Sequence, residues 1–146
     1  ELSLNIEFTN WMFADIHIIL LRMPENVELR LDDCQPFTLY TDRSRLTQVL
    51  TNLLTNAIKH TKKGYICFGY DVTEQEIRFY VTDTGEGIPD DQLERVFDRF
   101  VKLTQWTNGV GLGLAISKAL VTKLGGRIEV TSQQGVGSTF SVIFPR

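Results

Sequence analysis

Two asparagines and a lysine in the middle of the sequence have the types and spacing needed to bind a phosphorylated ligand. Asn52, Asn56 and Lys59 are spaced by four and then three residues, so in a helix they line one stripe. Amide oxygens ligate hard cations such as magnesium, and an ammonium group pairs with phosphate. The stripe borders an apolar face, so an ordinary solvated helix surface explains this segment, taken alone, equally well.

A second candidate is Asp83-Thr84-Gly85-Glu86-Gly87-Ile88, which directly follows an expected strand. A carboxylate at a strand end can accept a hydrogen bond from an exocyclic amine, such as N6 of adenine. The glycines let the backbone come close to a flat ring. A plain turn with Asp83 as a cap is the alternative for this motif alone.

Two further glycine-rich segments are weaker signals taken singly. Gly109–Leu114 opens an expected helix, where free backbone N–H groups suit phosphate. It lacks the Gly-Lys-Ser/Thr of a Walker motif, and no strand leads into it as in a dinucleotide fingerprint. Gly135–Phe140 is a turn into the last expected strand. The four motifs in this order are far more specific than any one of them.

The elements that must position these residues follow from periodicity and from turn and capping residues. A helix is predicted from about residue 5 to 23, closed by Pro24, and a longer one from the N-cap Asp42 to about Thr61. A short helix is predicted from Pro89 to Phe97, and another opens in the second glycine-rich loop and runs to Leu124. The predicted strands are Val27–Leu31, Phe37–Thr41, Tyr65–Val72, Glu76–Thr82, Arg127–Ser132 and Ser138–Phe144.

This order of helices and strands favours a mixed sheet with helices on one face over a doubly wound parallel sheet. A length of 146 residues fits one domain, and the net charge of -3 argues against general binding of nucleic acid or anionic membranes. The sequence contains no apolar run of membrane-spanning length, and we expect no signal peptide because its first residues lack a basic start and a small-residue cleavage site. It starts abruptly within sequence that reads as ordered, so we expect a fragment of a longer protein.

Together, the motifs resemble those of the ATP-binding catalytic domain of sensor histidine kinases. Gln48–Lys59 resembles the N box, Asp83–Ile88 the G1 box, Phe97–Phe100 the F box, Gly109–Leu114 the G2 box, and Gly135–Phe140 the closing motif. The resemblance covers nearly the whole chain. It implies an α/β (α+β) sandwich with a mixed, mainly antiparallel sheet. This is the Bergerat-type fold shared with gyrase, the heat-shock chaperone ATPase and the mismatch-repair ATPase, in which ATP lies between the helices and a lid.

The resemblance also implies roles for individual residues. Asn56 would ligate Mg²⁺, Asp83 would accept from adenine N6, and Lys59 and Arg99 are candidate contacts to the γ-phosphate. His60 stands where the family often has an aromatic residue, and would either reach the phosphates or pack. The full set carried over to the nucleotide is Asn52, Asn56, Lys59, His60, Asp83, Gly85, Gly87, Ile88, Gly109, Gly111, Leu112, Gly113 and Thr139. The segment Val101–Asn108 would form a short lid, with Trp106 in it.

The implied reaction is phosphoryl transfer from Mg–ATP to a histidine on a separate helical dimerisation domain, and from there to a response-regulator receiver domain. Neither His17 nor His60 has the acidic neighbour and nearby proline of such an acceptor. Asn52 stands where hydrolytic relatives carry a glutamate, and an amide is a poor general base. The parent is expected to be a homodimeric, membrane-anchored sensor with this domain in the cytoplasm. The alternatives are a regulatory nucleotide-binding module, an autonomous ATPase or serine kinase of the same superfamily, and a pure interaction domain.

Overall fold

A five-stranded mixed sheet is the framework of the protein in the computed structural model, which describes residues 2–4, 22–32, 37–39, 41–98 and 113–146. The strand order is β2-β4-β5-β7-β6. Only the pair β2–β4 is parallel, and the other three neighbouring pairs are antiparallel. The strands are β2 (Val27–Leu31), β4 (Gly64–Val72), β5 (Glu76–Asp83), β6 (Arg127–Gln133) and β7 (Gly137–Pro145). A separate antiparallel pair joins β1 (Leu2–Leu4) to β3 (Phe37–Leu39).

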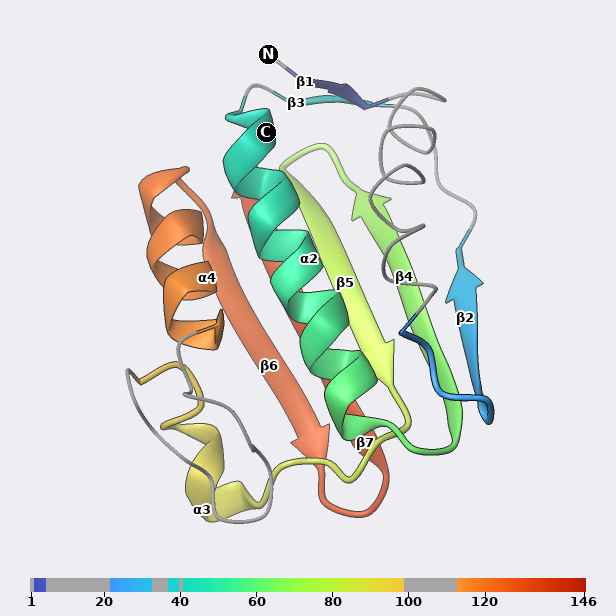
Figure 1. Ribbon diagram of the computed structural model, residues 1–146. Coiled ribbons are helices and arrows are strands. Elements are labelled where there is room, and N and C mark those ends of the chain that lie inside the picture. The colour runs from blue at the N-terminus through green and yellow to red at the C-terminus, as the bar shows by residue number, and fades with distance from the viewer. Residues whose placement is uncertain (1, 5–21, 33–36, 40, 99–112) are drawn as a thin grey trace.

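Two helices of the described part of the chain cover one face of the sheet (Figure 1). They are α2 (Arg43–His60), which packs against β5, and α4 (Gly113–Lys123), which packs against α2 and β6. A short helix, α3 (Asp90–Leu93), lies near the first turn of α4. The predicted fold class, a mixed and mainly antiparallel sheet with helices on one face, is confirmed.

The core forms where apolar positions of α2 meet one face of the sheet. Along β5, the alternation of buried and half-buried residues directs Ile77, Phe79 and Val81 toward the helices. The buried apolar residues of α2 that meet them recur at helical spacing: Leu46, Val49, Leu50, Leu53, Leu54 and Ala57. Burial of this stripe fixes the rotation of α2, and so fixes where its polar residues point.

The ends of the helices follow capping rules. The Asp42 side chain accepts from the backbone N–H of Arg45 at 3.2 Å and begins α2 as predicted. At the end of α4, Gly125 has a φ of +88°. The N–H groups of Gly126 and Gly125 donate to the carbonyls of Val121 (2.9 Å) and Thr122 (3.1 Å). This is a Schellman motif, which needs the left-handed conformation that glycine adopts most readily.

Some predicted elements differ from the structure in length. The helix predicted from Pro89 to Phe97 is α-helical only over Asp90–Leu93. The chain then tightens into turns, with backbone bonds of 3.0 Å from Arg95 to Gln92 and from Asp98 to Arg95, each spanning three residues. Residues 5–21 of the predicted first helix and the predicted lid lie outside the described residues. Among the helices that the structure describes, none is long and apolar enough to cross a membrane.

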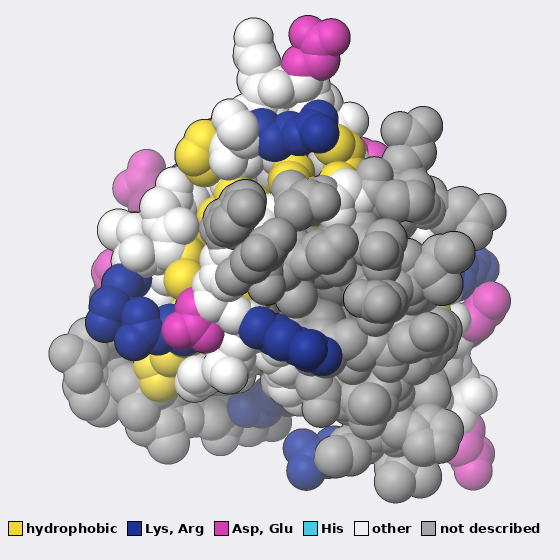
Figure 2. Space-filling view, turned by 90° about the horizontal axis from the view of Figure 1, so that it is seen from above, with side chains coloured by type: hydrophobic (Ala, Val, Ile, Leu, Met, Phe, Trp, Pro, Cys, Tyr) yellow, Lys and Arg dark blue, Asp and Glu magenta, His cyan; other side chains and the backbone are white. Residues whose placement is uncertain are grey.

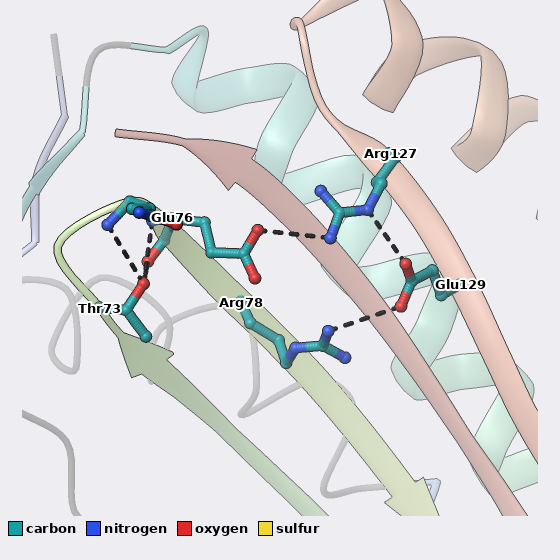
Figure 3. Close-up of polar contacts among 6 residues, drawn as sticks. Thr73, Glu76, Arg78, Arg127 and Glu129 are labelled. Atoms are coloured by element: carbon teal, nitrogen blue, oxygen red, sulfur yellow. Dashed lines mark hydrogen bonds and ion pairs between the residues drawn. The ribbon is translucent and has the colours of Figure 1, made fainter.

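The sheet face turned away from the helices carries a charged network (Figure 3). Arg127 contacts both Glu129 (3.0 Å) and Glu76 (3.3 Å), and Arg78 contacts Glu129 at 3.5 Å. The network links the edge strand β6 to β5 across β7.

At the upper end of the molecule, remote from the end of β5, Lys and Arg side chains lie beside hydrophobic ones (Figure 2).

Candidate nucleotide-binding site

The C-terminal end of α2 and the end of β5 lie at the lower end of the helix-covered face, where the Asp83–Ile88 loop leads from β5 to α3 (Figure 1). The first turn of α4 lies beside the middle of α2, where Asn52 contacts Gly113 and Ser117. The end of the Gln48–Lys59 motif and the Asp83–Ile88 motif therefore lie at one end of the sheet, and Gly113 and Leu114, the described residues of a third motif, lie beside α2.

Asp83 is a buried carboxyl group at the last position of β5, with 5% of its surface exposed. It lies on the helix-covered face, and the N–H of Gly85 donates to its Oδ1 at 2.8 Å. Burial raises its pKa above the ordinary range, while hydrogen bonds from the backbone of Gly85 and Ser138 act in the opposite direction. A carboxylate has about four lone-pair positions, so further acceptor capacity remains for a ligand's amino group.

The glycines of the loop allow close packing against the protein's own backbone. A Cβ atom on Gly85 would lie 2.4 Å from the carbonyl oxygen of His60, and one on Gly87 would lie 2.2 Å from that of Gln133. Gly87 also has a φ of +71°, where other residues are strained. Ile88 is fully buried, and its N–H donates to Ser132 Oγ at 2.7 Å. The loop is therefore held in a defined position beside Asp83.

The resemblance implies that Thr139 lies beside Asp83 and contacts adenine through ordered water, but the structure places its side chain on the opposite face of the sheet. Thr139 pairs with Thr82 in the β5–β7 register, and their hydroxyl groups are 2.9 Å apart on the face away from the helices. Ser138 pairs with Asp83 and is buried with it on the helix-covered face. Its Oγ lies 2.8 Å from Ser132 Oγ. Successive strand residues point to opposite faces of the sheet. A shift of one position therefore decides whether Ser138 or Thr139 lies beside Asp83. Ser138, which the sequence argument missed, is the hydroxyl beside Asp83.

On α2, the predicted stripe is present and one of its residues is tied to α4. Asn52 Nδ2 donates to Ser117 Oγ at 3.3 Å and approaches the Gly113 carbonyl oxygen at 3.5 Å. Ser117 is fully buried and donates to the same carbonyl at 2.8 Å. Asn56 is half-buried and Lys59 is exposed. Asn52 therefore links the stripe to the first turn of α4. Ser117, which accepts the bond from Asn52, was not indicated by the sequence.

His60 is buried at the last position of α2, and its Nδ1 lies 2.9 Å from Glu86 Oε1. A carboxylate only accepts, so the ring nitrogen donates. Burial lowers the pKa of His60, Glu86 raises it in part, and Lys59 lowers it further. Of the two options for His60, packing is the one that the structure supports, with the added bond to Glu86.

Several predicted residues lie outside the described part of the chain: Arg99, Gly109, Gly111 and Leu112. Gly113 is described as the exposed first residue of α4. Phe97 of the F-box segment packs edge-on against Phe140, with ring centroids 6.1 Å apart. The start of that segment is therefore fixed to the core beside the site.

The described residues fit a magnesium ion that is held mainly by a ligand's phosphates. They contain no group of three or more His, Cys, Asp or Glu side chains that could form a metal cage. The half-buried amide of Asn56 is one hard oxygen ligand beside the cationic Lys59. Mg²⁺ keeps several waters and often takes only one or two protein ligands in addition to phosphate oxygens.

With this geometry established, comparison with known proteins identifies the family. Residues 41–146 match the family described as "Histidine kinase-, DNA gyrase B-, and HSP90-like ATPase". The chain belongs to this family. The match begins one residue before the N-cap of α2 and includes every motif discussed above.

Individual relatives are sensor kinases. The chain is 44% identical over 110 residues to the sensor protein SrrB of Staphylococcus aureus, covering 72% of this chain and 19% of SrrB. It superimposes on a mycobacterial sensor histidine kinase, MprB, with a TM-score of 0.82, 27% identity and coverage of 94% and 95% of the two chains. For full-length ShkA in complex with AMPPNP, the TM-score is 0.83 with 31% identity, covering 99% of this chain and 30% of ShkA. The chain thus spans about a fifth of the sensor protein that it matches.

Proposed function

We propose that this chain binds Mg–ATP and presents its γ-phosphoryl group to a histidine on a separate helical dimerisation domain of the same sensor kinase. The observation that carries the proposal is the buried carboxyl group of Asp83. It lies at the same end of the sheet as the last turns of α2, which carry Asn56 and Lys59. The AMPPNP bound by the structural relative ShkA supports the choice of an adenine nucleotide.

Recognition of the base would depend on Asp83. Its Oδ1 already accepts from Gly85, so the carboxylate is oriented before a ligand arrives. An ionised acceptor in a buried site bonds an exocyclic amine more strongly than an exposed one, because water competes less there. The buried hydroxyl of Ser138 lies on the same face and is suited to a water-mediated contact.

The phosphates would extend from Asp83 toward the α2 stripe and the first turn of α4. Asn56 would hold Mg²⁺ and Lys59 would pair with phosphate oxygens. When bound, Mg²⁺ neutralises charge on the phosphate oxygens. Asn52, which bonds to Ser117 in this structure, is placed to bring the first turn of α4 into the same region.

The site offers positioning and charge but no general base at Asn52. Because an amide is a poor base, water should not be activated and ATP should be hydrolysed slowly. Holding donor and acceptor together supplies much of the rate of phosphoryl transfer. The acceptor histidine, the receiver domain that would take the phosphoryl group next, the homodimeric membrane-anchored parent and the cytoplasmic location all belong to this proposal.

The binding half of the proposal is tested by calorimetry with ATP and adenosine, each with and without magnesium. We expect magnesium to strengthen ATP binding in the wild type, and Asn56→Ala to remove that effect while adenosine binding changes little. A wild-type magnesium effect in Asn56→Ala would exclude Asn56 as the ligand. A chain that binds no nucleotide would be the pure interaction domain.

The transfer half is tested with radiolabelled ATP. The chain alone should bind ATP and remain unlabelled, because neither of its histidines resembles an acceptor. Addition of the parent's helical domain should produce an acid-labile label on that domain. Binding without transfer would favour the regulatory module, and a label or fast turnover on the chain alone would favour the autonomous enzyme.

A further inference from the structure

His60 and Glu86 are joined by two contacts that the proposed nucleotide contacts do not require. The Nδ1–H of His60 donates to Glu86 Oε1 at 2.9 Å, and the N–H of Glu86 donates to the carbonyl oxygen of His60 at 3.4 Å. The His60 side chain is 7% exposed and that of Glu86 45% exposed. A buried ring at the end of α2 is therefore bonded to a residue in the middle of the Asp83–Ile88 loop.

The same loop is fixed on its other side by the turn between β6 and β7. The N–H of Gly135 donates to the carbonyl oxygen of Glu86 at 2.7 Å. Gly87 packs against the Gln133 carbonyl so closely that a side chain would not fit. On the side of α2, the loop is held by the close approach of Gly85 to the His60 carbonyl oxygen and by the bond from Thr84 Oγ1 to the Lys63 carbonyl oxygen at 3.0 Å. The His60–Glu86 bond is the contact between two side chains on that side, and it joins α2 to the middle of the loop.

We propose that His60 and Glu86 form a positioning pair that sets the distance between the base acceptor Asp83 and the phosphate-binding end of α2. The inference rests on the proposed nucleotide site and deepens it. His60 directly follows Lys59, and Glu86 lies three residues after Asp83. The pair therefore joins the two half-sites directly through side chains. A ligand that spans both gains affinity when their spacing is fixed in advance, because binding then orders less of the protein.

This geometry predicts a specific pattern of affinities for Glu86→Ala. Binding of Mg–ATP, which needs both half-sites, should weaken about tenfold, the scale of one charge-assisted hydrogen bond. Adenosine uses only the Asp83 half, and magnesium tripolyphosphate uses only the α2 half. Each of these probes should change by less than about twofold. A loss of packing would instead weaken adenosine along with ATP.

Matched variants separate positioning from folding. Glu86→Gln keeps an acceptor and should lose less affinity than Glu86→Ala. His60→Asn carries an amide N–H near the position of Nδ1 and should retain more affinity than His60→Ala. Combining His60→Ala with Glu86→Ala should weaken Mg–ATP no further than the worse single change, because both remove the same contact. Glu74→Ala, at the exposed turn between β4 and β5, is the control and should match the wild type.

The experiment is calorimetric titration of the folded chain with Mg–ATP, adenosine and magnesium tripolyphosphate, with melting curves for every variant. The exposed Glu86 keeps the test valid if changes at the buried His60 prevent folding. Unchanged Mg–ATP affinity in Glu86→Ala, an equal loss for adenosine, or additive effects in the double variant would overturn the pair. A wild type that binds none of the three probes would overturn the proposed function itself.

Discussion

On the helix-covered face of the sheet, Asp83 and Ser138 lie opposite each other on β5 and β7, each with 5% of its surface exposed. On the other face of the same strands, Arg78, Arg127 and Glu129 form an open network (Figure 3). Both regions are polar, yet only one is removed from water. A buried carboxyl group lowers stability when it ionises, whereas exposed ion pairs change stability little in either direction.

This difference in burial separates polar residues that are candidates for ligand binding from polar residues of the solvated surface. The network contains positive and negative side chains on solvated strands, and the ion pairs between them account for it without a ligand. Asp83 has a pKa raised by burial, and its hydrogen bonds come only in part from its own loop. A group whose pKa is shifted in this way, at a site bordered by the ends of a helix and a strand, is a candidate for contact with a ligand.

The change Asp83→Asn should weaken ADP binding most. The loss of an ionised acceptor costs about 1.5–3 kcal/mol, or roughly tenfold to 150-fold in affinity, and an amide can also direct its NH2 toward the donor of adenine. Calorimetry with ADP measures the effect. Asp71→Asn, an exposed residue of β4 on the other face, is the matched control and should bind like the wild type. If Asp83→Asn stays within twofold of the wild type, adenine is not read by this carboxylate.

The neighbouring positions Ser138 and Thr139 give a comparison within a single strand. Ser138→Ala should weaken adenosine binding about fivefold, because a neutral hydrogen bond beside Asp83 is lost. Thr139→Val should have no effect, since its hydroxyl bonds to Thr82 on the opposite face. Titration of both variants with adenosine tests the register directly. The reverse order of effects would restore the original placement of Thr139.

The fold was largely predictable because its elements obey local rules. The bounds of α2 followed from Asp42 and the apolar stripe, and β2 was predicted to the residue. The error at Thr139 has a simple cause: strand periodicity is two, and a motif that names two adjacent residues does not say which one faces the helices. The His60–Glu86 bond joins residues 26 apart, and only the packing of α2 against the loop brings them together.

Acid should affect the two faces in different pH ranges. The folded state lowers the pKa of His60 from its ordinary 6.5, so the unfolded chain binds more protons and stability falls as the pH drops below about 6.5. The pKa of Glu129 is lowered from 4.5 by Arg127, so its contribution is lost only below about 4.5. Urea unfolding between pH 7.5 and 5.5 should show a slope that His60→Asn reduces and Glu129→Gln leaves unchanged. Equal slopes in wild type and His60→Asn would mean that His60 does not titrate differently on folding.

The smallest effect is expected at the centre of the exposed network. Glu129 contacts both Arg78 and Arg127, so Glu129→Gln removes the charge from two ion pairs at once. Both partners are solvated, water replaces the lost interactions, and salt already screens them. The melting temperature should change by no more than about 3 °C, and less still in high salt. Mg–ATP affinity should be unchanged, because the network lies on the opposite face of the sheet from Asp83. A large change in nucleotide affinity would mean that the edge strand β6 transmits strain through β7 to Ser138, and that the two faces are coupled rather than independent.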